Sequence, residues 1–292
     1  MKIAYLLLVH KNADQVNRLI DRLADGDNGI FIHVDKKSDI HKDINKLPNT
    51  HFVKHRIKGE WGGYSLIEAT MALFDLALAC SENYDYYILL SGQDYPLKSN
   101  AFIKKFLIQN RGKEFFKIRE MPYHHWVKQR GGFDRIEIYY PKWILGNTRK
   151  KWIIRNLYVQ LCKALGFLKK RQFFKKYYGI SQWFAISRNA VEYIYKYSQE
   201  NVDALKFFKN SLIPDEIFFS TIIMNSHFKD KVEPTDLKLV DWTTGPEMPL
   251  IWKEEHISRI INSEALFARK FDMDIDSKVL DQIDKELLGV CC

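Results

Sequence analysis

The sequence predicts an α/β protein with a central sheet flanked by helices, and three observations lead to this fold class. Apolar runs of strand length alternate with helical patterns over the first hundred residues, as in parallel βαβ units. Apolar residues make up 46% of the 292 residues and charged residues 28%, which excludes disordered, collagen-like and coiled-coil chains. No repeat or Gly/Ser/Pro-rich linker interrupts the chain. We therefore expect a single domain over 1–292, regular at about 1–110 and irregular at about 111–292.

The first two strands and the helix between them have the clearest patterns. The apolar run 3–9 has strand length, and the run 30–34 predicts a second strand that ends on Asp35. Asn12 and Gln15 form a variant of the capping box, which opens a helix. The apolar positions of this helix follow at the expected spacing and are Val16, Leu19, Ile20 and Leu23.

Two more strands and a buried helix complete the regular half. Residues 51–55 predict a short strand and residues 86–90 a longer one. Ser65 and Glu68 predict the cap of a helix that runs to about Cys80. This helix is apolar on nearly all sides, so we expect it to be buried.

The carboxyl ends of these strands are the expected place for a ligand, because open α/β sheets bind ligands there. His10 follows the first strand, Asp35 the second, and the polar segment 91–94 the strand at 86–90. In the second half, residues 182–187 predict a strand and 189–198 a helix. A further helix opens at Pro-Asp-Glu, residues 214–216.

The net charge of +9 belongs to one segment of the chain. No Asp or Glu occurs between Tyr139 and Val191, whereas twelve Lys or Arg residues do. The remaining sequence has 33 basic and 36 acidic residues, so it is close to neutral. We therefore interpret residues 139–178 as a basic insert and expect no nucleic-acid partner.

The cysteines and the N-terminus favour a cytoplasmic protein. Four cysteines without a C-x-x-C pair form no disulfide framework, which is typical of a reducing compartment. No apolar run approaches the roughly 18–20 residues of a membrane span. The apolar N-terminal run has no small-residue cleavage site, so we interpret it as a strand rather than a signal peptide.

Several common site types are absent from the sequence. It has no G-x-G-x-x-G, P-loop, G-x-S-x-G or H-E-x-x-H motif. Asp-x-Asp patterns, which hold a metal in some nucleotide-sugar enzymes, occur at 25–27 and 272–276. We predict both to be solvated turns, and a metal-dependent site at 272–276 remains an alternative.

Five segments in chain order carry a family resemblance. They are Ile-His-Val-Asp-Lys-Lys at 32–37, Trp-Gly-Gly-Tyr-Ser at 61–65, Leu-Ser-Gly-Gln-Asp-Tyr-Pro-Leu at 90–97, Pro-Asp-Glu at 214–216 and Leu-Phe-Ala-Arg-Lys-Phe-Asp at 266–272. Together they resemble the core-2/I-branching β-1,6-N-acetylglucosaminyltransferase and peptide O-xylosyltransferase family, glycosyltransferase family 14. The resemblance implies a GT-A fold with a Rossmann-like mixed central sheet, an inverting mechanism, a UDP-sugar donor, and no metal or other cofactor.

The resemblance also assigns the two halves and the partners. The half at 1–110 would hold the nucleotide-sugar, and the half at 111–292 the acceptor and the catalytic base. The chain lacks the anchor, stem and many cysteines of animal members and resembles the shorter bacterial ones. This implies transfer of GlcNAc or xylose, with a β linkage, to a glycan or lipid-linked glycan in the cytoplasm.

For catalysis, the resemblance places the base at Glu216. An inverting transfer needs a carboxylate to take the proton from the acceptor hydroxyl as that oxygen attacks the anomeric carbon. At the N-terminus of a helix the dipole favours the ionised carboxylate. Asp215 beside it would cap the helix or orient the base.

For the leaving diphosphate, the family uses basic side chains in place of a metal. The strand end at 91–94 carries only one acid. Lys270 matches one of the family's basic residues directly. The other is an Arg in many members, and the closest position here is Lys238, which keeps the charge but loses bidentate geometry.

The remaining site residues follow from motif order. The donor set is His10, Asp35, Trp61 and Asp94, where Asp35 fits a contact with uracil or ribose. The acceptor set is Glu120, Arg135 and Trp183. For His10 and Trp61, packing is an equally good interpretation.

The basic insert predicts an amphipathic helix. Apolar residues spaced along one of its sides are Ile153, Leu157, Leu161, Leu165 and Leu168. This pattern is typical of a helix that lies peripherally on an anionic membrane, here the inner face of the cytoplasmic membrane. The competing interpretation is a helix packed on the body with its basic face in solvent. A second hypothesis for the whole chain is a non-catalytic module that binds membrane or nucleic acid through this insert.

Overall fold

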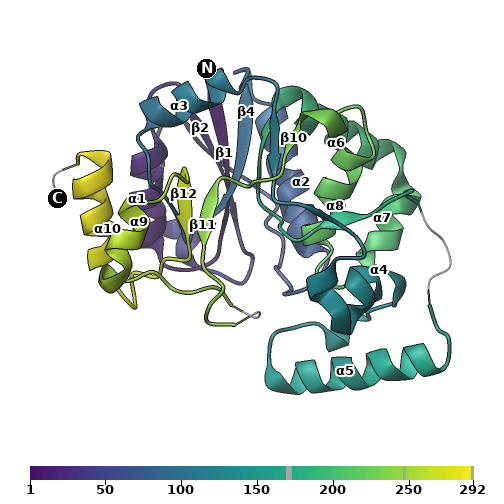
Figure 1. The fold of residues 1–292 in the computed structure, drawn as a ribbon. Coiled ribbons are helices and arrows are strands. Elements are labelled where there is room, and N and C mark those ends of the chain that lie inside the picture. Colours follow the sequence, from purple (N-terminus) through teal and green to yellow (C-terminus); the bar gives the residue numbers. More distant parts are fainter. Residues whose placement is uncertain (169–172, 246–247, 291–292) are drawn as a thin grey trace.

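Strands and helices alternate over much of the chain, as Figure 1 shows. The structure is a computed structural model, and it describes residues 1–168, 173–245 and 248–290. The strands are β1 (Ile3–Val9), β2 (Gly29–Val34), β3 (Thr50–Phe52), β4 (Tyr86–Ser91), β5 (Asp94–Pro96), β6 (Glu114–Phe116), β7 (Arg119–Glu120), β8 (Tyr178–Gly179), β9 (Phe184–Ser187), β10 (Val232–Glu233), β11 (Lys238–Val240) and β12 (Phe267–Arg269). The α-helices are α1 (Ala13–Leu23), α2 (Ser65–Leu78), α3 (Asn100–Gln109), α4 (Phe133–Glu137), α5 (Arg149–Ala164), α6 (Arg188–Glu200), α7 (Val202–Lys209), α8 (Asp215–Met224), α9 (Ile257–Ile261) and α10 (Lys278–Ile283).

A seven-stranded mixed sheet forms the centre, in the order β10-β6-β9-β4-β1-β2-β3. The strands β3, β2, β1 and β4 are parallel, while β9 runs antiparallel between β4 and β6. A second sheet, β11-β12-β5, joins the C-terminal segment to the short strand that follows β4. Strands from both predicted halves therefore share both sheets. The mixed α/β fold class predicted from the sequence is confirmed.

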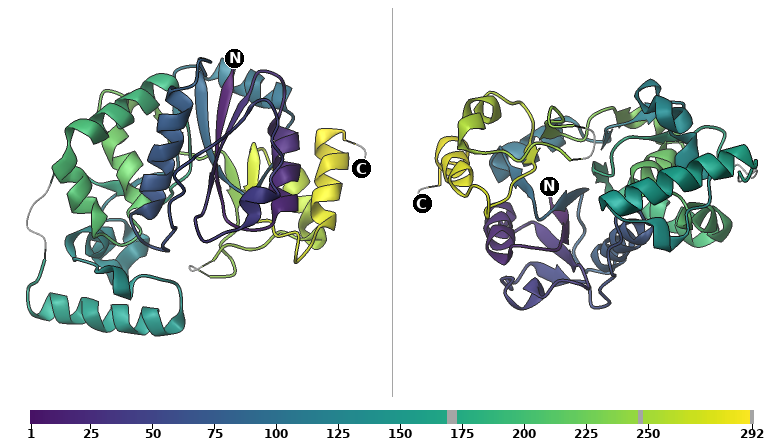
Figure 2. Two further views of the ribbon diagram at one scale, coloured as in Figure 1. Left: turned by 180° about the vertical axis from the view of Figure 1, so that it is seen from behind. Right: turned by 90° about the horizontal axis from the view of Figure 1, so that it is seen from below.

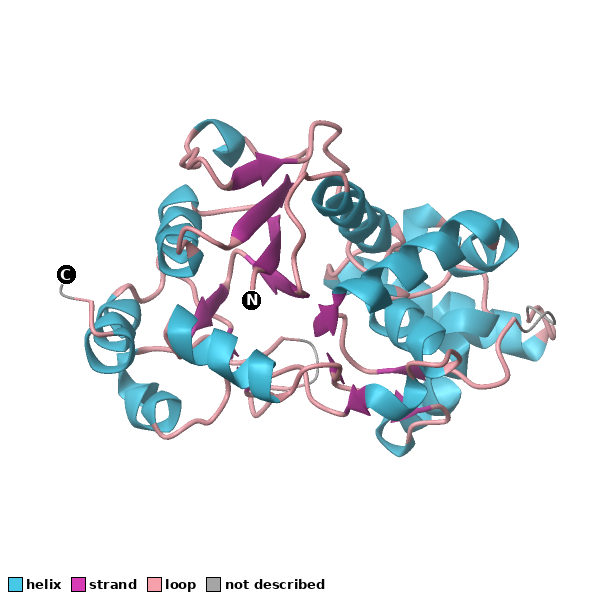
Figure 3. Cartoon of the chain, turned by 90° about the horizontal axis from the view of Figure 1, so that it is seen from above, coloured by secondary structure: helices cyan, strands magenta, loops and turns pink. Residues whose placement is uncertain are grey.

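The pleat of β1 divides the hydrophobic core into two layers. Ala4, Leu6 and Leu8 face the cluster built by α2, α6, α7 and α8. The alternate residues of β1 face the cluster built by α1, α3, α9 and α10. Figure 3, which looks down on the sheet, shows these helices on its two sides. Every residue of β1 is buried, as expected for a central parallel strand.

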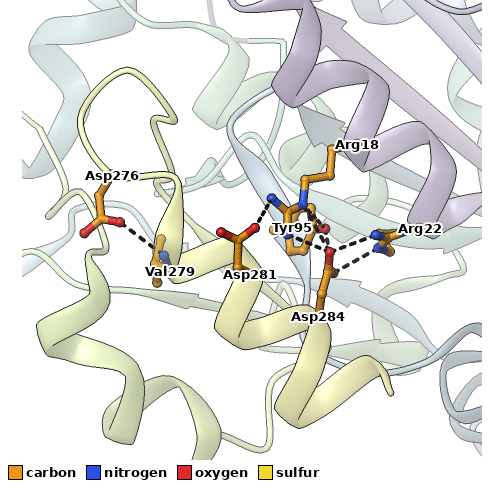
Figure 4. Close-up of polar contacts among 7 residues, drawn as sticks. All are labelled: Arg18, Arg22, Tyr95, Asp276, Val279, Asp281 and Asp284. Carbon is orange, nitrogen blue, oxygen red and sulfur yellow. Dashed lines mark hydrogen bonds and ion pairs between the residues drawn. The ribbon is translucent and has the colours of Figure 1, made fainter. Parts of the chain in front are cut away.

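A charged cluster holds the C-terminal helix against α1 (Figure 4). Asp284, with no exposed side-chain surface, accepts hydrogen bonds from Arg18 at 2.7 Å, Arg22 at 2.8 Å and the Tyr95 hydroxyl at 2.7 Å. Asp281 accepts a further bond from Arg18 at 2.7 Å. Because Tyr95 belongs to β5, the cluster also fixes the second sheet, and with it the segment after β12.

Several local expectations need correction. The third strand is Thr50–Phe52 rather than 51–55. Asn12 caps α1 as expected, accepting from the Gln15 N–H, but the Gln15 side chain bonds to Gly92 and Phe271 instead of closing the capping box. Ser65 is the first residue of α2 and caps nothing, because its hydroxyl accepts from the Glu60 N–H.

The basic insert forms α5 at the margin of the molecule, below α4 in Figure 1 and on the near side in the right-hand view of Figure 2. Three of its predicted basic residues, Lys169, Lys170 and Arg171, lie outside the described residues. Within the described ranges, no helix combines the length and apolarity that crossing a membrane requires.

Candidate active site

Glu216, the second residue of α8, lies against Arg135 of α4. Arg135 donates from Nη1 to Glu216 Oε2 at 2.6 Å and from Nε to Gln129 Oε1 at 2.6 Å. Its guanidinium carbon also lies 3.8 Å from the centroid of the Trp126 ring. Arg135 is buried, whereas the side chain of Glu216 is 27% exposed. The structure therefore brings the predicted base and a predicted acceptor residue into contact, where solvent still reaches the carboxylate.

Two residues with strained backbone lie close to Glu216, one in the chain just before it and one bonded to its backbone carbonyl. Ile213 has φ 49° and Ile180 has φ 115°, a region that β-branched residues rarely adopt. Ile180 donates its N–H to the Glu216 carbonyl at 3.2 Å, and Ile213 donates to the Gly62 carbonyl at 2.8 Å. A Cβ on Gly179 would lie 2.8 Å from the same Glu216 oxygen, so this approach requires glycine. Strain of this kind concentrates at functional sites.

Asp215, the first residue of α8, is buried. Its Oδ1 has no hydrogen-bond partner among the described residues. Burial, together with the charge of Glu216, raises the pKa of Asp215 to about 7. The helix α8 has no side-chain cap, so the structure does not support the capping role and leaves the orienting role as the expectation.

A second cluster forms around Asp94 and Lys238, both with almost no exposed side-chain surface. Lys238 Nζ donates to Asp94 Oδ1 at 3.1 Å and to the Leu89 carbonyl at 3.0 Å. Asp94 also accepts bonds from the Ser91 N–H and hydroxyl. Burial lowers the pKa of Lys238 to about 8 against the opposing pull of Asp94. Burial would raise the pKa of Asp94, yet Lys238, Arg269 and the Ser91 bonds lower it.

The aromatic ring of Trp183 lies within this cluster. Lys238 Nζ is 3.9 Å and Arg269 Cζ 4.3 Å from the ring centroid, and Trp183 is 8% exposed. These placements disagree with three expectations. Lys238 is engaged by Asp94 and cannot contact a diphosphate directly, Asp94 is closed off from a donor, and Trp183 offers an acceptor almost no surface.

A third group surrounds His10, at the carboxyl end of β1. Asp35 follows β2, and its N–H donates to the Val9 carbonyl at 2.8 Å. Desolvation and the charge of Lys270 lower the pKa of His10, against the pull of Asp35. Partial burial and the charge of Arg269 lower the pKa of Lys270 itself. His10, Asp35 and Lys270 are thus brought together, from segments far apart in the sequence.

The Asp-x-Asp segment at 272–276 is not the solvated turn we predicted. Asp272 is buried and pairs with Lys11 at 2.5 Å. Asp276 accepts the N–H groups of Glu254 and Val279. Among the described residues, no three His, Cys, Asp or Glu side chains are grouped as metal ligands would be. The pair at 25–27 binds Lys104 at a turn, as expected.

The two remaining predicted residues lie at the periphery of the site. Trp61 is 42% exposed, and its ring centroid is 5.2 Å from the guanidinium carbon of Arg155. Glu120 of β7 is exposed and binds Lys176 at 2.8 Å and the Tyr178 hydroxyl at 3.3 Å. The bond from Lys176 lowers the pKa of Glu120.

The segment 178–183 connects the Glu216–Arg135 pair to the cluster of Lys238 and Arg269. Ile180 bonds to the Glu216 backbone, and Ser181 donates its hydroxyl to Asp236 Oδ2 at 2.9 Å. Trp183 then contacts Lys238 and Arg269. This short segment therefore contacts both the Glu216 backbone and the Lys238–Arg269 cluster.

Sequence analysis missed three residues of this arrangement. Arg269 adjoins Lys270 within a recognised motif, so its position gave a usable signal. Gln129 and Trp126, which hold Arg135, lie in an irregular segment with no periodic pattern. Only the tertiary contact reveals them.

The structure is an α/β protein with Arg269 and Lys270 at the carboxyl end of β12 and Glu216 at the start of α8, and the family match places it in the glycosyltransferase class. The chain belongs to the Core-2/I-Branching enzyme family, whose family model matches residues 3–261. This confirms the family expected from the five motifs.

The curated relatives are xylosyltransferases. Xylosyltransferase 2 of Homo sapiens is 28% identical over 315 residues, in a match that covers 99% of this chain and 34% of the relative. Xylosyltransferase 1 of Homo sapiens is 26% identical, and 31% of it is covered. The chain thus spans about a third of the length of the curated relatives it matches. Mouse xyloside xylosyltransferase 1, a solved structure, is 12% identical, with 92% of this chain and 97% of that one covered; its TM-score of 0.37 carries no argument.

Proposed function

We propose that the chain is an inverting, metal-independent glycosyltransferase. It moves a sugar, GlcNAc or xylose, from a UDP-sugar to a hydroxyl of a glycan or lipid-linked glycan and forms a β linkage. The observation that carries the proposal is the Glu216–Arg135 pair, which is joined through the segment 178–183 to the cluster of Arg269 and Lys238. The names of the xylosyltransferase relatives support xylose as one of the donors to test.

In the proposed reaction Glu216 acts as the general base. The acceptor oxygen bonds to the anomeric carbon and transfers its proton to Glu216, while the bond from that carbon to the UDP oxygen breaks. The electron pair leaves with UDP, which gains negative charge. Arg135 fixes the orientation of the base from one side, and Asp215 supports it from beneath.

Cationic side chains take the place of a metal in this proposal. Lys270 and Arg269, both partly buried, neutralise the departing diphosphate. Lys238 acts indirectly, since it holds Asp94 and supports the Trp183 ring beside Arg269. Asp94, the one acid at this strand end, is committed to Lys238 and is not free to bind a cation. His10 and Asp35 contact the nucleoside.

The decisive experiment measures UDP release from UDP-GlcNAc and UDP-xylose in the presence of EDTA. Wild-type protein is expected to turn over at least one donor, and Glu216→Gln to lose about 10²–10⁴-fold in rate while still binding UDP. Glu233→Gln, which changes a partly exposed acid on β10 that pairs with Lys113, is the matched control and should keep full rate. Turnover that depends on added Mn²⁺ would contradict metal independence, and binding without turnover of any donor would favour a non-catalytic module.

A further inference from the structure

The outward face of α5 is an apolar stripe that nothing in the described chain covers. Its members, at a spacing of four residues, are Ile153, Leu157, Leu161 and Leu165, which are 44%, 67%, 55% and 55% exposed. Trp143 and Phe167, at 60% and 66%, extend the stripe at its two ends. A helix on a protein surface normally turns its apolar stripe toward the core. The competing interpretation, a helix packed on the body, holds for the opposite face of α5 and for Leu168, but these four stripe residues do not take part in that packing.

The inward face of α5 is instead partly cationic. Arg155 is buried, donates to the Gly146 carbonyl at 3.0 Å and lies over Trp61. Lys163 pairs with Asp134 at 2.5 Å. Apolar side chains of the same face, among them Ile154 and Cys162, also pack on the body, so both faces of the helix carry apolar residues and only the outward stripe is left for another surface.

These inward contacts reach the catalytic residues. Asp134, the partner of Lys163, immediately precedes Arg135, which binds Glu216. Cys162 shares a small hydrophobic cluster with Leu212, two residues before the Pro-Asp-Glu segment. Figure 1 shows α5 beyond the end of the sheet toward which β1 and β4 run. The apolar stripe and the candidate active site thus lie at the same end of the molecule.

The charge around the stripe indicates what covers it. Lys142, Arg149 and Lys150 are exposed beside it, and none forms an ion pair with another described residue. The absence of any Asp or Glu over 140–190 removes the repulsion that an anionic surface would meet. Exposed Trp143 and Trp152 fit the polar–apolar boundary of a bilayer, where tryptophan is enriched. Apolar, basic and tryptophan side chains together match the headgroup region of an anionic membrane.

We propose that α5 docks the protein on an anionic lipid bilayer, with Leu157 and Leu161 inserted, and that this holds the active site against the membrane surface. The acceptor is then a lipid-linked glycan presented at that surface. The statement about the acceptor rests on the proposed glycosyltransferase function, whereas docking does not.

The test is cosedimentation of the full chain with phosphatidylcholine vesicles that contain phosphatidylglycerol, and with vesicles of phosphatidylcholine alone. Wild-type protein is expected to bind the anionic vesicles, and less so as salt is raised. A Leu157→Gln/Leu161→Gln variant should bind about tenfold or more weakly, because two large side chains no longer enter the apolar layer. Phe102→Gln/Ile108→Gln, on the exposed face of α3, is the matched control and should bind like wild type.

The possible outcomes separate docking from catalysis. Glu216→Gln should bind vesicles fully while releasing no UDP, and Leu157→Gln/Leu161→Gln should release UDP from free donor at the wild-type rate. Docking is overturned if wild type stays in the supernatant or if the double variant binds unchanged. It is also overturned if the double substitution converts a dimer to a monomer in light scattering without affecting vesicle binding. In that case the stripe joins two copies of the chain.

Discussion

Lys238 and Lys270 show how one residue type serves two purposes at neighbouring places in the fold. Lys238 is sealed against Asp94, while Lys270 is only partly buried and lies near His10. A buried ion pair loses about 3–5 kcal/mol when one partner is removed, because the other charge is left uncompensated. A bond from a charged group to a ligand contributes about 1.5–3 kcal/mol. Substitution of Lys270 should therefore weaken ligand binding, whereas substitution of Lys238 should lower stability.

We predict that Lys270→Gln weakens UDP binding by about tenfold or more and leaves stability nearly unchanged. Lys238→Gln should instead lower the free energy of unfolding by about 3–5 kcal/mol. Calorimetric titration with UDP and urea unfolding measure the two quantities. Lys105→Gln, on α3, controls for loss of a positive charge. A large stability loss in Lys270→Gln would show that its role is structural.

Asp215 predicts an unusual dependence of stability on pH. Its pKa is raised from 3.8 in the unfolded chain to about 7 in the fold, so the folded state binds this proton more tightly. Its contribution is fully present below about pH 4 and is lost as pH rises through about 7, up to about 4 kcal/mol in all. Relative to Asp215→Asn, wild type should lose stability over this window. Urea unfolding across the pH range measures the difference, and Asp230→Asn, an exposed acid, should show none of it.

Among the elements, the pairing of α10 with α1 positions the basic end of β12. Arg18, Arg22 and Tyr95 converge on Asp284, so one buried carboxylate makes most of the polar contacts of this cluster (Figure 4). Burial would raise the pKa of Asp284, but the bonds from Arg22, Tyr95 and Arg18 lower it. Its stabilisation is therefore present above about pH 4 and is lost as pH falls through the lowered value.

We predict that Asp284→Asn costs about 3–5 kcal/mol of stability, because two arginines lose a buried partner. Asp281→Asn, which removes a bond to a half-exposed carboxylate, should cost less than about 1 kcal/mol. Chemical unfolding measures both. If α10 docks mainly through its apolar residues, the two variants will have equal stability. The charged cluster around Asp284 then contributes little to the stability of the fold.

For the molecule as a whole, the location of the charge matters more than its sum. The +9 comes from the segment around α5, and the rest of the chain is nearly neutral. Two of the cations on α5, Arg155 and Lys163, face inward and are not available to an external polyanion. The exposed cations lie beside an apolar stripe. An anionic membrane can bind the cations and bury the stripe, whereas a nucleic acid can bind only the cations.

We therefore predict no appreciable binding to a labelled DNA duplex at about 0.15 M salt, although the same protein binds anionic vesicles under these conditions. Fluorescence anisotropy measures the former. A Lys142→Gln/Arg149→Gln/Lys150→Gln variant should lose vesicle binding and leave the anisotropy of the duplex unchanged. Tight DNA binding that this variant abolishes would instead favour the nucleic-acid module.

The sequence by itself determined the elements and the family. Strands such as Ile3–Val9 and the helix that begins at Asn12 depend on local periodicity and capping, and they lie as predicted. The five motifs identified the family because each is recognised from its residue types and their order along the chain, which need no knowledge of tertiary contacts. Contacts along one helix or strand are set by neighbours in the chain, so a linear pattern contains them.

The tertiary structure alone decided which of the predicted side chains are available. Lys238 and Asp94 are 144 residues apart and neutralise each other, and the apolar stripe of α5 faces outward although its spacing equally suits a packed helix. Gln129 is recognised as part of the candidate site only from its hydrogen bond with Arg135. Ion pairing and burial depend on partners distant in sequence, whose approach is fixed by the packing of the two core layers. The spacing of residues along the chain does not contain that information.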